Sequence, residues 1–202
     1  MNIISLPLFL IAVVLHEYAH GWAADKLGDH TAKDSGRLTL NPLAHIDPMG
    51  TIFLPLMLTL MRSPVVFGWA KPVPVNFALL RHPKRDMLLV SIAGIAANLL
   101  MAVLFSILLR AGLFAANTYG WLWLNYGVLI NLVLAVFNAV PIPPLDGSKV
   151  LLGILPRKLA LSYAQLERYG FLLLIAFLWL GLFDRIVWPV IMLVARSLGV
   201  VL

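Results

Sequence analysis

The sequence predicts an all-α polytopic membrane protein, because its apolar residues are abundant and gathered in long blocks. Of the 202 residues, 61% are hydrophobic and 12% are charged, a balance too apolar for an ordinary soluble domain. Three blocks, at about 2–24, 87–109 and 121–140, are each long enough to cross about 30 Å of hydrocarbon as a helix. We therefore expect a three-helix core.

One or two further helices are expected after this core. The apolar block near 169–183 predicts a fourth span. The segment 186–202 is either a fifth span or an amphipathic tail, because Arg196 leaves the depth of this segment in the bilayer undetermined. The first block is expected to be a permanent span and not a cleaved signal peptide. We expect one domain over 1–202, with its core at about 1–150 and its C-terminal helices at about 151–202.

A shorter apolar block at 51–61 predicts a re-entrant hairpin. It is too short to cross comfortably and contains Pro55, and the run at 65–76 is interrupted by Pro and Gly and cannot be a continuous helix. Most of the 15 Lys and Arg residues lie in the loops 25–50, 62–86 and 142–168, and none lies in 112–120. If 51–61 enters the membrane and returns to the same side, all three basic loops lie on the cytoplasmic side and the N-terminus lies outside. A full crossing would put the most basic loop opposite the other two.

Charge and cysteine content exclude several classes of function. The formal net charge of +6 does not indicate nucleic-acid binding, because the basic residues lie between apolar blocks and not along an aromatic-studded face. The chain has no cysteine, which excludes disulfides, thiolate metal sites and cysteine nucleophiles. Any metal must therefore be held by His and carboxylate side chains.

The strongest motif lies near the inner end of the first block, where His16-Glu17-Tyr18-Ala19-His20 has the form HExxH. On a helix the i, i+4 spacing puts both imidazoles on one face, where they can bind one Zn²⁺, and places the Glu as general base on the metal-bound water. The alternative is a set of satisfied polar residues in a helix bundle. Each ionisable residue in a span costs about 2.5 kcal/mol or more unless paired or hydrated, which favours a functional site.

A third protein ligand is needed, because two His residues leave zinc short of its usual number. The candidate is Asp146, in the stretch 138–147, where Pro141, Pro143 and Pro144 break the third block near the depth of His20. From the residues alone, Asp146 is equally well explained as the N-cap of an interfacial helix.

Together these residues resemble the site-2 protease family of intramembrane zinc metalloproteases, in particular its small bacterial and archaeal members without a PDZ domain. The resemblance rests on HEYAH, the NxxPxPPLDG-like stretch 138–147, Ala93-Gly94 and Asn98 in the middle block, and the connecting pieces 41–51 and 68–76. It covers most of residues 10–150. It implies one Zn²⁺ per chain.

By that resemblance His16, His20 and Asp146 are the metal ligands and Glu17 is the catalytic base. Asn138 and Asn98 are implied to bind substrate, although each is equally well explained as an interhelical hydrogen bond.

A second metal site could be imagined at His45 and Asp47. No paired ligand spacing surrounds these two residues. We expect them instead to order the loop after the first helix.

The resemblance implies hydrolysis of a peptide bond within or near a transmembrane segment of a membrane-protein substrate. The piece 68–76 would hold an unwound substrate strand by edge pairing, or is a simple surface loop. The expected partners are that substrate and the lipid bilayer, in a multi-pass protein of the cell membrane with its active site near the cytoplasmic side. Two other classes stay open: a metal-ion transporter, which predicts ligands in series along a pore, and an inactive protease-like scaffold.

Overall fold

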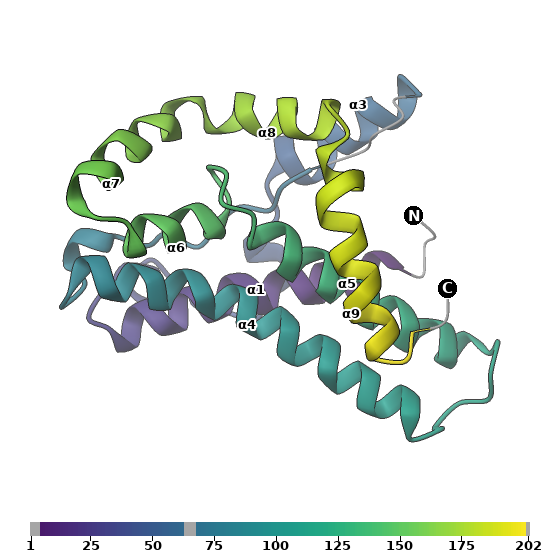
Figure 1. Cartoon of the computed structure of the whole chain (residues 1–202). Coiled ribbons are helices and arrows are strands. Elements are labelled where there is room, and N and C mark those ends of the chain that lie inside the picture. Colours follow the sequence, from purple (N-terminus) through teal and green to yellow (C-terminus); the bar gives the residue numbers. More distant parts are fainter. Residues whose placement is uncertain (1–4, 63–67, 201–202) are drawn as a thin grey trace.

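The computed structural model describes residues 5–62 and 68–200, and no strand occurs within these two ranges. The three longest helices are α1 (Ser5–Lys26), α4 (Pro83–Arg110) and α5 (Tyr119–Asn138), which pack against one another. They form the predicted three-helix core (Figure 1). Residues 1–4, 63–67 and 201–202, which include the start of the first predicted span and the end of the last, lie outside the described residues.

Shorter helices join and cover this core. They are α2 (Thr31–Asp34), α3 (Leu54–Leu60), α6 (Asp146–Ile154), α7 (Arg157–Ala164), α8 (Gly170–Trp179) and α9 (Trp188–Ser197), with single turns at Pro42–His45, Pro48–Phe53, Phe77–Leu79, Gln165–Tyr169 and Phe183–Val187. The basic segment 142–168, expected to connect two spans, contains the short helices α6 and α7. These helices are too short to register as spans, so hydropathy alone could not reveal them.

Among the described residues, two helices, α4 and α5, are each long and apolar enough to cross a membrane. The helical stretches Arg157–Trp179 and Phe183–Ser197 meet the same criterion only together, with a bend of 69° between them. The predicted fourth span and the segment 186–202, which was left open as a fifth span or an amphipathic tail, are therefore parts of one bent pair. Helix α1 is comparably long, but the polar residues of HEYAH lower its hydropathy, and its crossing of the bilayer stays a prediction.

The hairpin expected at 51–61 leaves the core and returns to it at the same point. The Trp69 backbone N–H donates to the Gly50 carbonyl at 3.1 Å, and the Thr51 hydroxyl donates to the Trp69 carbonyl at 2.8 Å. Between these contacts the chain forms the turn Pro48–Phe53 and α3, with exposed apolar side chains such as Leu56 and Leu60. This arrangement agrees with a re-entrant piece, and its depth in a bilayer stays a prediction.

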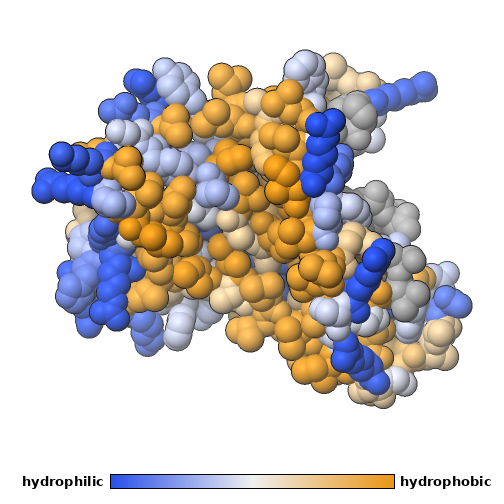
Figure 2. Space-filling view, viewed as in Figure 1, coloured by the Kyte–Doolittle hydropathy of each residue, from blue (hydrophilic) through white to orange (hydrophobic). Residues whose placement is uncertain are grey.

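One buried apolar cluster lies where α4, α5, α8 and α9 meet. It consists of Ala102, Val128, Leu132, Phe177, Val187, Ile191, Ala195 and Val200. On the outside, large apolar side chains are exposed along α4 and α8, including Leu100, Ile107 and Trp179. Figure 2 shows a broad hydrophobic surface over the middle of the molecule, with hydrophilic side chains at its edges. Such a surface suits contact with lipid and not with water.

Candidate metal centre and active-site cavity

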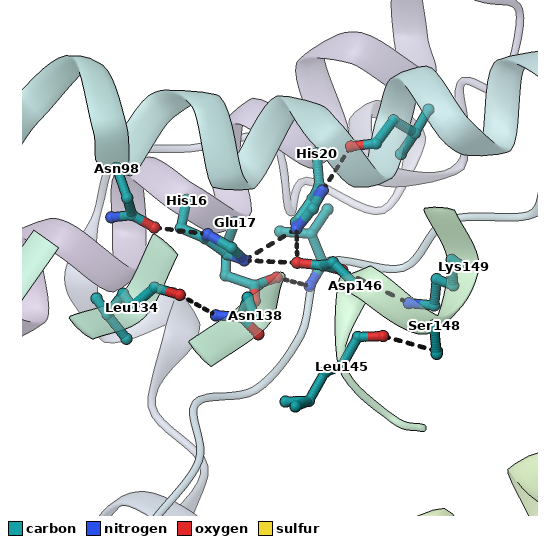
Figure 3. A network of polar contacts seen from close by, with 12 residues as sticks. His16, Glu17, His20, Asn98, Leu134, Asn138, Leu145, Asp146, Ser148 and Lys149 are labelled. Carbon is teal, nitrogen blue, oxygen red and sulfur yellow. Dashed lines mark hydrogen bonds and ion pairs between the residues drawn. The ribbon is translucent and has the colours of Figure 1, made fainter. Parts of the chain in front are cut away.

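The two His residues of HEYAH meet Asp146 in one buried cluster. The His16 and His20 Nε2 atoms are 3.0 Å apart, and the Asp146 Oδ2 atom lies 3.1 Å from the first and 3.0 Å from the second (Figure 3). All three residues are less than a tenth exposed. Within the described part of the chain, this is the one group of three or more His and carboxylate side chains close enough to share a metal ion.

Asp146 reaches the two imidazoles because α6 starts immediately after the proline-rich turn that ends α5. At Gly147 an added Cβ would lie 2.5 Å from the Val140 carbonyl oxygen and from the Ala139 carbonyl carbon, so only glycine allows this turn to fold so tightly. The N-cap of α6 is Leu145, and no side chain caps the helix. The carboxylate of Asp146 therefore faces the His residues and does not cap a helix.

Hydrogen bonds behind the imidazoles orient both rings. His16 Nδ1 lies 2.7 Å from Asn98 Oδ1, and His20 Nδ1 lies 2.8 Å from the Val90 carbonyl oxygen. Because both partners are oxygens held as acceptors, each Nδ1 carries the proton and donates it. The Nε2 lone pairs are thereby directed toward the centre of the cluster, as in protein zinc sites.

Gly94 lets α4 approach these rings. A Cβ added there would lie 2.6 Å from His20 Cε1 and 2.7 Å from His16 Cε1, closer than side chains tolerate. The sequence marked Gly94 only as part of the Ala93-Gly94 pair. Its role in making room for the two imidazoles requires the packing of α4 on α1.

The donor set fits zinc. A tetrahedral zinc with bonds of about 2.0–2.1 Å separates its ligand atoms by about 3.3 Å, and the three atoms here lie 3.0–3.1 Å apart. Adjustments of a few tenths of an ångström would suffice. Two imidazoles and one carboxylate are also the ligand types of catalytic zinc sites, which keep one position open.

A cavity of about 340 Å³ opens beside the cluster. Its polar lining consists of His16, Glu17, His20, Ser91, Asn138, Asp146 and Lys149, and its apolar lining of Pro72, Val73, Val75, Phe77, Val90 and Pro144. Glu17 Oε2 accepts a hydrogen bond from the Val73 backbone N–H at 2.7 Å. The Glu17 carboxylate is therefore on the cavity wall, outside the set of three candidate ligands, as the base assignment requires.

The two Asn residues that the resemblance implied as substrate contacts lie in different places. Asn138 lines the cavity, and its amide donates to the Leu134 carbonyl at 3.0 Å. Asn98 is fully buried behind His16, where its amide donates to the Ala12 carbonyl at 3.1 Å and to Asn131 Oδ1 at 3.0 Å. The position of Asn98 does not support substrate binding; it supports the alternative, an interhelical hydrogen bond.

His45 and Asp47 order the loop, as expected. Asp47 Oδ1 accepts from the backbone N–H groups of Met49 and Gly50 at 2.9 and 2.7 Å, and His45 Nε2 lies 2.9 Å from the Thr39 carbonyl oxygen. Both side chains thus serve the backbone of their own loop.

The stretch 68–76 runs along the cavity without helical structure and is held from several sides. Arg37 donates to the carbonyls of Lys71 and Pro72 at 2.9 and 3.1 Å. The Asn76 N–H donates to Asp29 Oδ2 at 2.6 Å, and Asp29 is fully buried. The anchoring role of Asp29 and Arg37 was not predicted, because nothing in their local sequence indicates which distant backbone they bind.

A helical membrane protein with an HExxH helix, a distant Asp completing the cluster and an adjoining cavity defines the class of membrane-embedded metallopeptidases. The family model described as Peptidase family M50 matches residues 114–181. The "Putative zinc metalloprotease YwhC" of Bacillus subtilis is 36% identical over 189 residues, which cover 90% of this chain and 83% of YwhC. The chain belongs to peptidase family M50, the site-2 protease family.

Two more distant relatives are also named zinc metalloproteases. The "Putative zinc metalloprotease Rip2" of Mycolicibacterium smegmatis is 32% identical over 170 residues, covering 84% of this chain and 64% of Rip2. The "Zinc metalloprotease MJ0392" of Methanocaldococcus jannaschii is 26% identical over 151 residues, covering 75% of this chain and 34% of that protein. None of the solved structures matches the chain.

Proposed function

We propose that this protein is a zinc metalloprotease that hydrolyses a peptide bond within or near a transmembrane segment of a membrane-protein substrate. The observation that carries the proposal is the buried triangle of His16, His20 and Asp146 with Glu17 on the wall of the same cavity. Membership of family M50 and the names of the relatives support it. The apolar surface of the helical body supports a substrate that is itself in the membrane.

Each residue has a role in this proposal. His16, His20 and Asp146 would hold one zinc ion per chain, and zinc, when bound, polarises a carbonyl and makes a water more acidic. Glu17 takes a proton from the attacking water and returns one to the leaving amine. The Val73 N–H, bonded to Glu17 Oε2, orients the carboxylate for these transfers.

The substrate would lie as an extended strand in the cavity. A helical segment hides its carbonyls in i to i−4 hydrogen bonds, so it must unwind before it is cut. Val73 and Val75 line the cavity on a piece of chain without helical structure, beside which an unwound strand can align. Asn138, which also lines the cavity, would hold the backbone of that strand through its amide.

We further propose a multi-pass protein of the cell membrane with its N-terminus outside and its active site near the cytoplasmic side. The distribution of Lys and Arg among the loops supports this topology. Because the chain has no cysteine, Asn117→Cys and Ser162→Cys can each be probed with an impermeant thiol reagent. Position 117 should react in intact cells and 162 only after lysis; the reverse pattern would contradict the topology.

The two alternative functions, a metal-ion transporter and an inactive protease-like scaffold, require different arrangements of the metal ligands. A transporter needs ligands in series, whereas the described His and carboxylate side chains with metal-site spacing form a single cluster. An inactive scaffold needs no reaction at all.

Purified protein should be incubated with a panel of transmembrane substrates, with a zinc chelator, and with the chelator followed by excess Zn²⁺. We expect cleavage that the chelator stops and zinc restores, at a bond within or next to the membrane segment. Cleavage that the chelator leaves unchanged, or no cleavage of any substrate, would contradict the proposal.

A further inference from the structure

Ser91 is a buried hydroxyl on α4 that the proposed reaction does not yet use. It is 1% exposed and contributes to the wall of the active-site cavity. Its Oγ forms no hydrogen bond with any of the described residues. By contrast Ser106, also on α4 and 3% exposed, donates to the Leu198 carbonyl at 2.5 Å.

A buried hydroxyl without a partner is unfavourable, above all in a helix that can cross a membrane, where no bulk water can replace the missing bond. Serine in a helix usually avoids this cost by bonding back to the carbonyl one turn earlier. On α5, Asn131 and Asn138 form such bonds: their side-chain amides donate to the backbone carbonyls four residues earlier, at 2.8 and 3.0 Å. Ser91 does not, so its hydroxyl is left as an unpaired donor on a residue of the cavity wall.

The neighbours of Ser91 put it on the metal side of that cavity. The preceding residue, Val90, binds His20 Nδ1 through its carbonyl, and Gly94, one turn later, contacts both imidazoles. Helix α6 runs antiparallel to α4 from Asp146 to Gly153, which packs against Leu88. Ser91 thus lies on the helix that orients His20, and this helix packs against the one that supplies Asp146.

We propose, on the basis of the proposed proteolytic function, that Ser91 is a further catalytic residue whose hydroxyl stabilises the scissile carbonyl oxygen. When water adds to the carbonyl carbon, a C–O bond forms, the C=O π bond breaks, and its electron pair moves to the carbonyl oxygen. The proton of the water goes to Glu17. Ser91 Oγ–H donates a hydrogen bond to the oxygen that has become negative, and keeps its own proton.

The charge of the cavity wall agrees with this role. Lys149 is the one positively charged side chain among the described residues that line the cavity. Its Nζ lies 3.9 Å from Asp146 Oδ1, the oxygen that does not face the imidazoles, and 5.6 Å from the centroid of the Phe77 ring. A fixed ammonium group beside the ligand Asp favours negative charge on a bound substrate.

The test compares Ser91→Ala with Ser106→Ala, measuring kcat, KM, zinc per chain and the midpoint of thermal unfolding in detergent. For Ser91→Ala we expect kcat to fall about 10²-fold with little change in KM, as when one oxyanion donor is removed. Zinc content should stay at the parental level. The unfolding midpoint should be unchanged or higher, because an unsatisfied buried group has been removed. Ser106→Ala should instead lower the midpoint and leave kcat unchanged.

A second readout does not depend on turnover. A peptide phosphinate carries negative oxygens that resemble the tetrahedral species, so its affinity should fall about 10²-fold in Ser91→Ala and stay at the parental value in Ser106→Ala. Parental kcat and phosphinate affinity in Ser91→Ala would overturn the role of Ser91 while leaving the proposed function intact. Loss of zinc or of stability in Ser91→Ala would overturn it in favour of a structural role. A parent without zinc-dependent cleavage would overturn both proposals.

Discussion

Replacing Gly94 with alanine should empty the metal site without unfolding the protein. The new Cβ would lie 2.6 Å from His20 Cε1 and 2.7 Å from His16 Cε1. Carbon atoms pack comfortably at about 3.5 Å or more, so the two rings must move by about 0.9 and 0.8 Å. Metal sites tolerate deviations of only about 0.2 Å in their bond lengths. The two Nε2 atoms and Asp146 Oδ2 can then no longer share one ion.

The assay is competition for zinc against chelators of graded affinity, with far-UV circular dichroism as a check on folding. We expect Gly94→Ala to bind zinc at least about 10²-fold more weakly, the upper end of the losses caused by disturbing the groups around metal ligands. Gly127→Ala is a matched control. Its Cβ would lie 2.8 Å from the Phe105 ring, so it crowds the contact between α5 and α4, away from the cluster of His16, His20 and Asp146. It should lose stability and keep its zinc. Parental zinc affinity in Gly94→Ala would show that the close approach of Gly94 to the imidazoles is not needed for metal binding.

Three further substitutions test separate parts of the site. Asp146→Ala should lose zinc, whereas Asp47→Ala, which removes only a loop cap, should retain it; the opposite result would require a different ligand set. Asn98→Ala should weaken zinc binding by about 10- to 100-fold, because His16 loses the acceptor that orients its ring; unchanged affinity would show that this hydrogen bond does not matter. Val73→Pro removes the N–H that binds Glu17 and should lower kcat about tenfold or more at constant zinc content, while Val73→Ala keeps the parental rate; equal rates in the two variants would argue against the orienting role.

The parts of the site that sequence could predict are those set by local geometry or by a dense motif. The i, i+4 spacing alone puts His16 and His20 on one helix face. The length of the apolar blocks predicts the core helices to within a few residues. Asp146, by contrast, lies far along the chain from His20, and its assignment depended on the resemblance. The residues by themselves left the N-cap alternative open.

What sequence could not predict depends on contacts between distant segments. For Asn98 the sequence left substrate binding and an interhelical hydrogen bond equally open, and the packing of α4 on α1 puts its side chain behind His16. The orientation of α4 about its own axis also places Gly94 against the imidazoles and Ser91 in the wall of the cavity. Asp29 gives no local sign that it binds the Asn76 backbone. Hydropathy and periodicity describe single helices and carry no information on how one helix is turned toward the next.

The most direct test of the central claim is Glu17→Gln, with zinc per chain and cleavage of a transmembrane substrate measured on the same preparation. The proposed mechanism assigns Glu17 to proton transfer, with the metal held by His16, His20 and Asp146. It therefore predicts a zinc content equal to that of the parent and a loss of detectable cleavage. Cleavage near the parental rate, or loss of zinc together with activity, would contradict it.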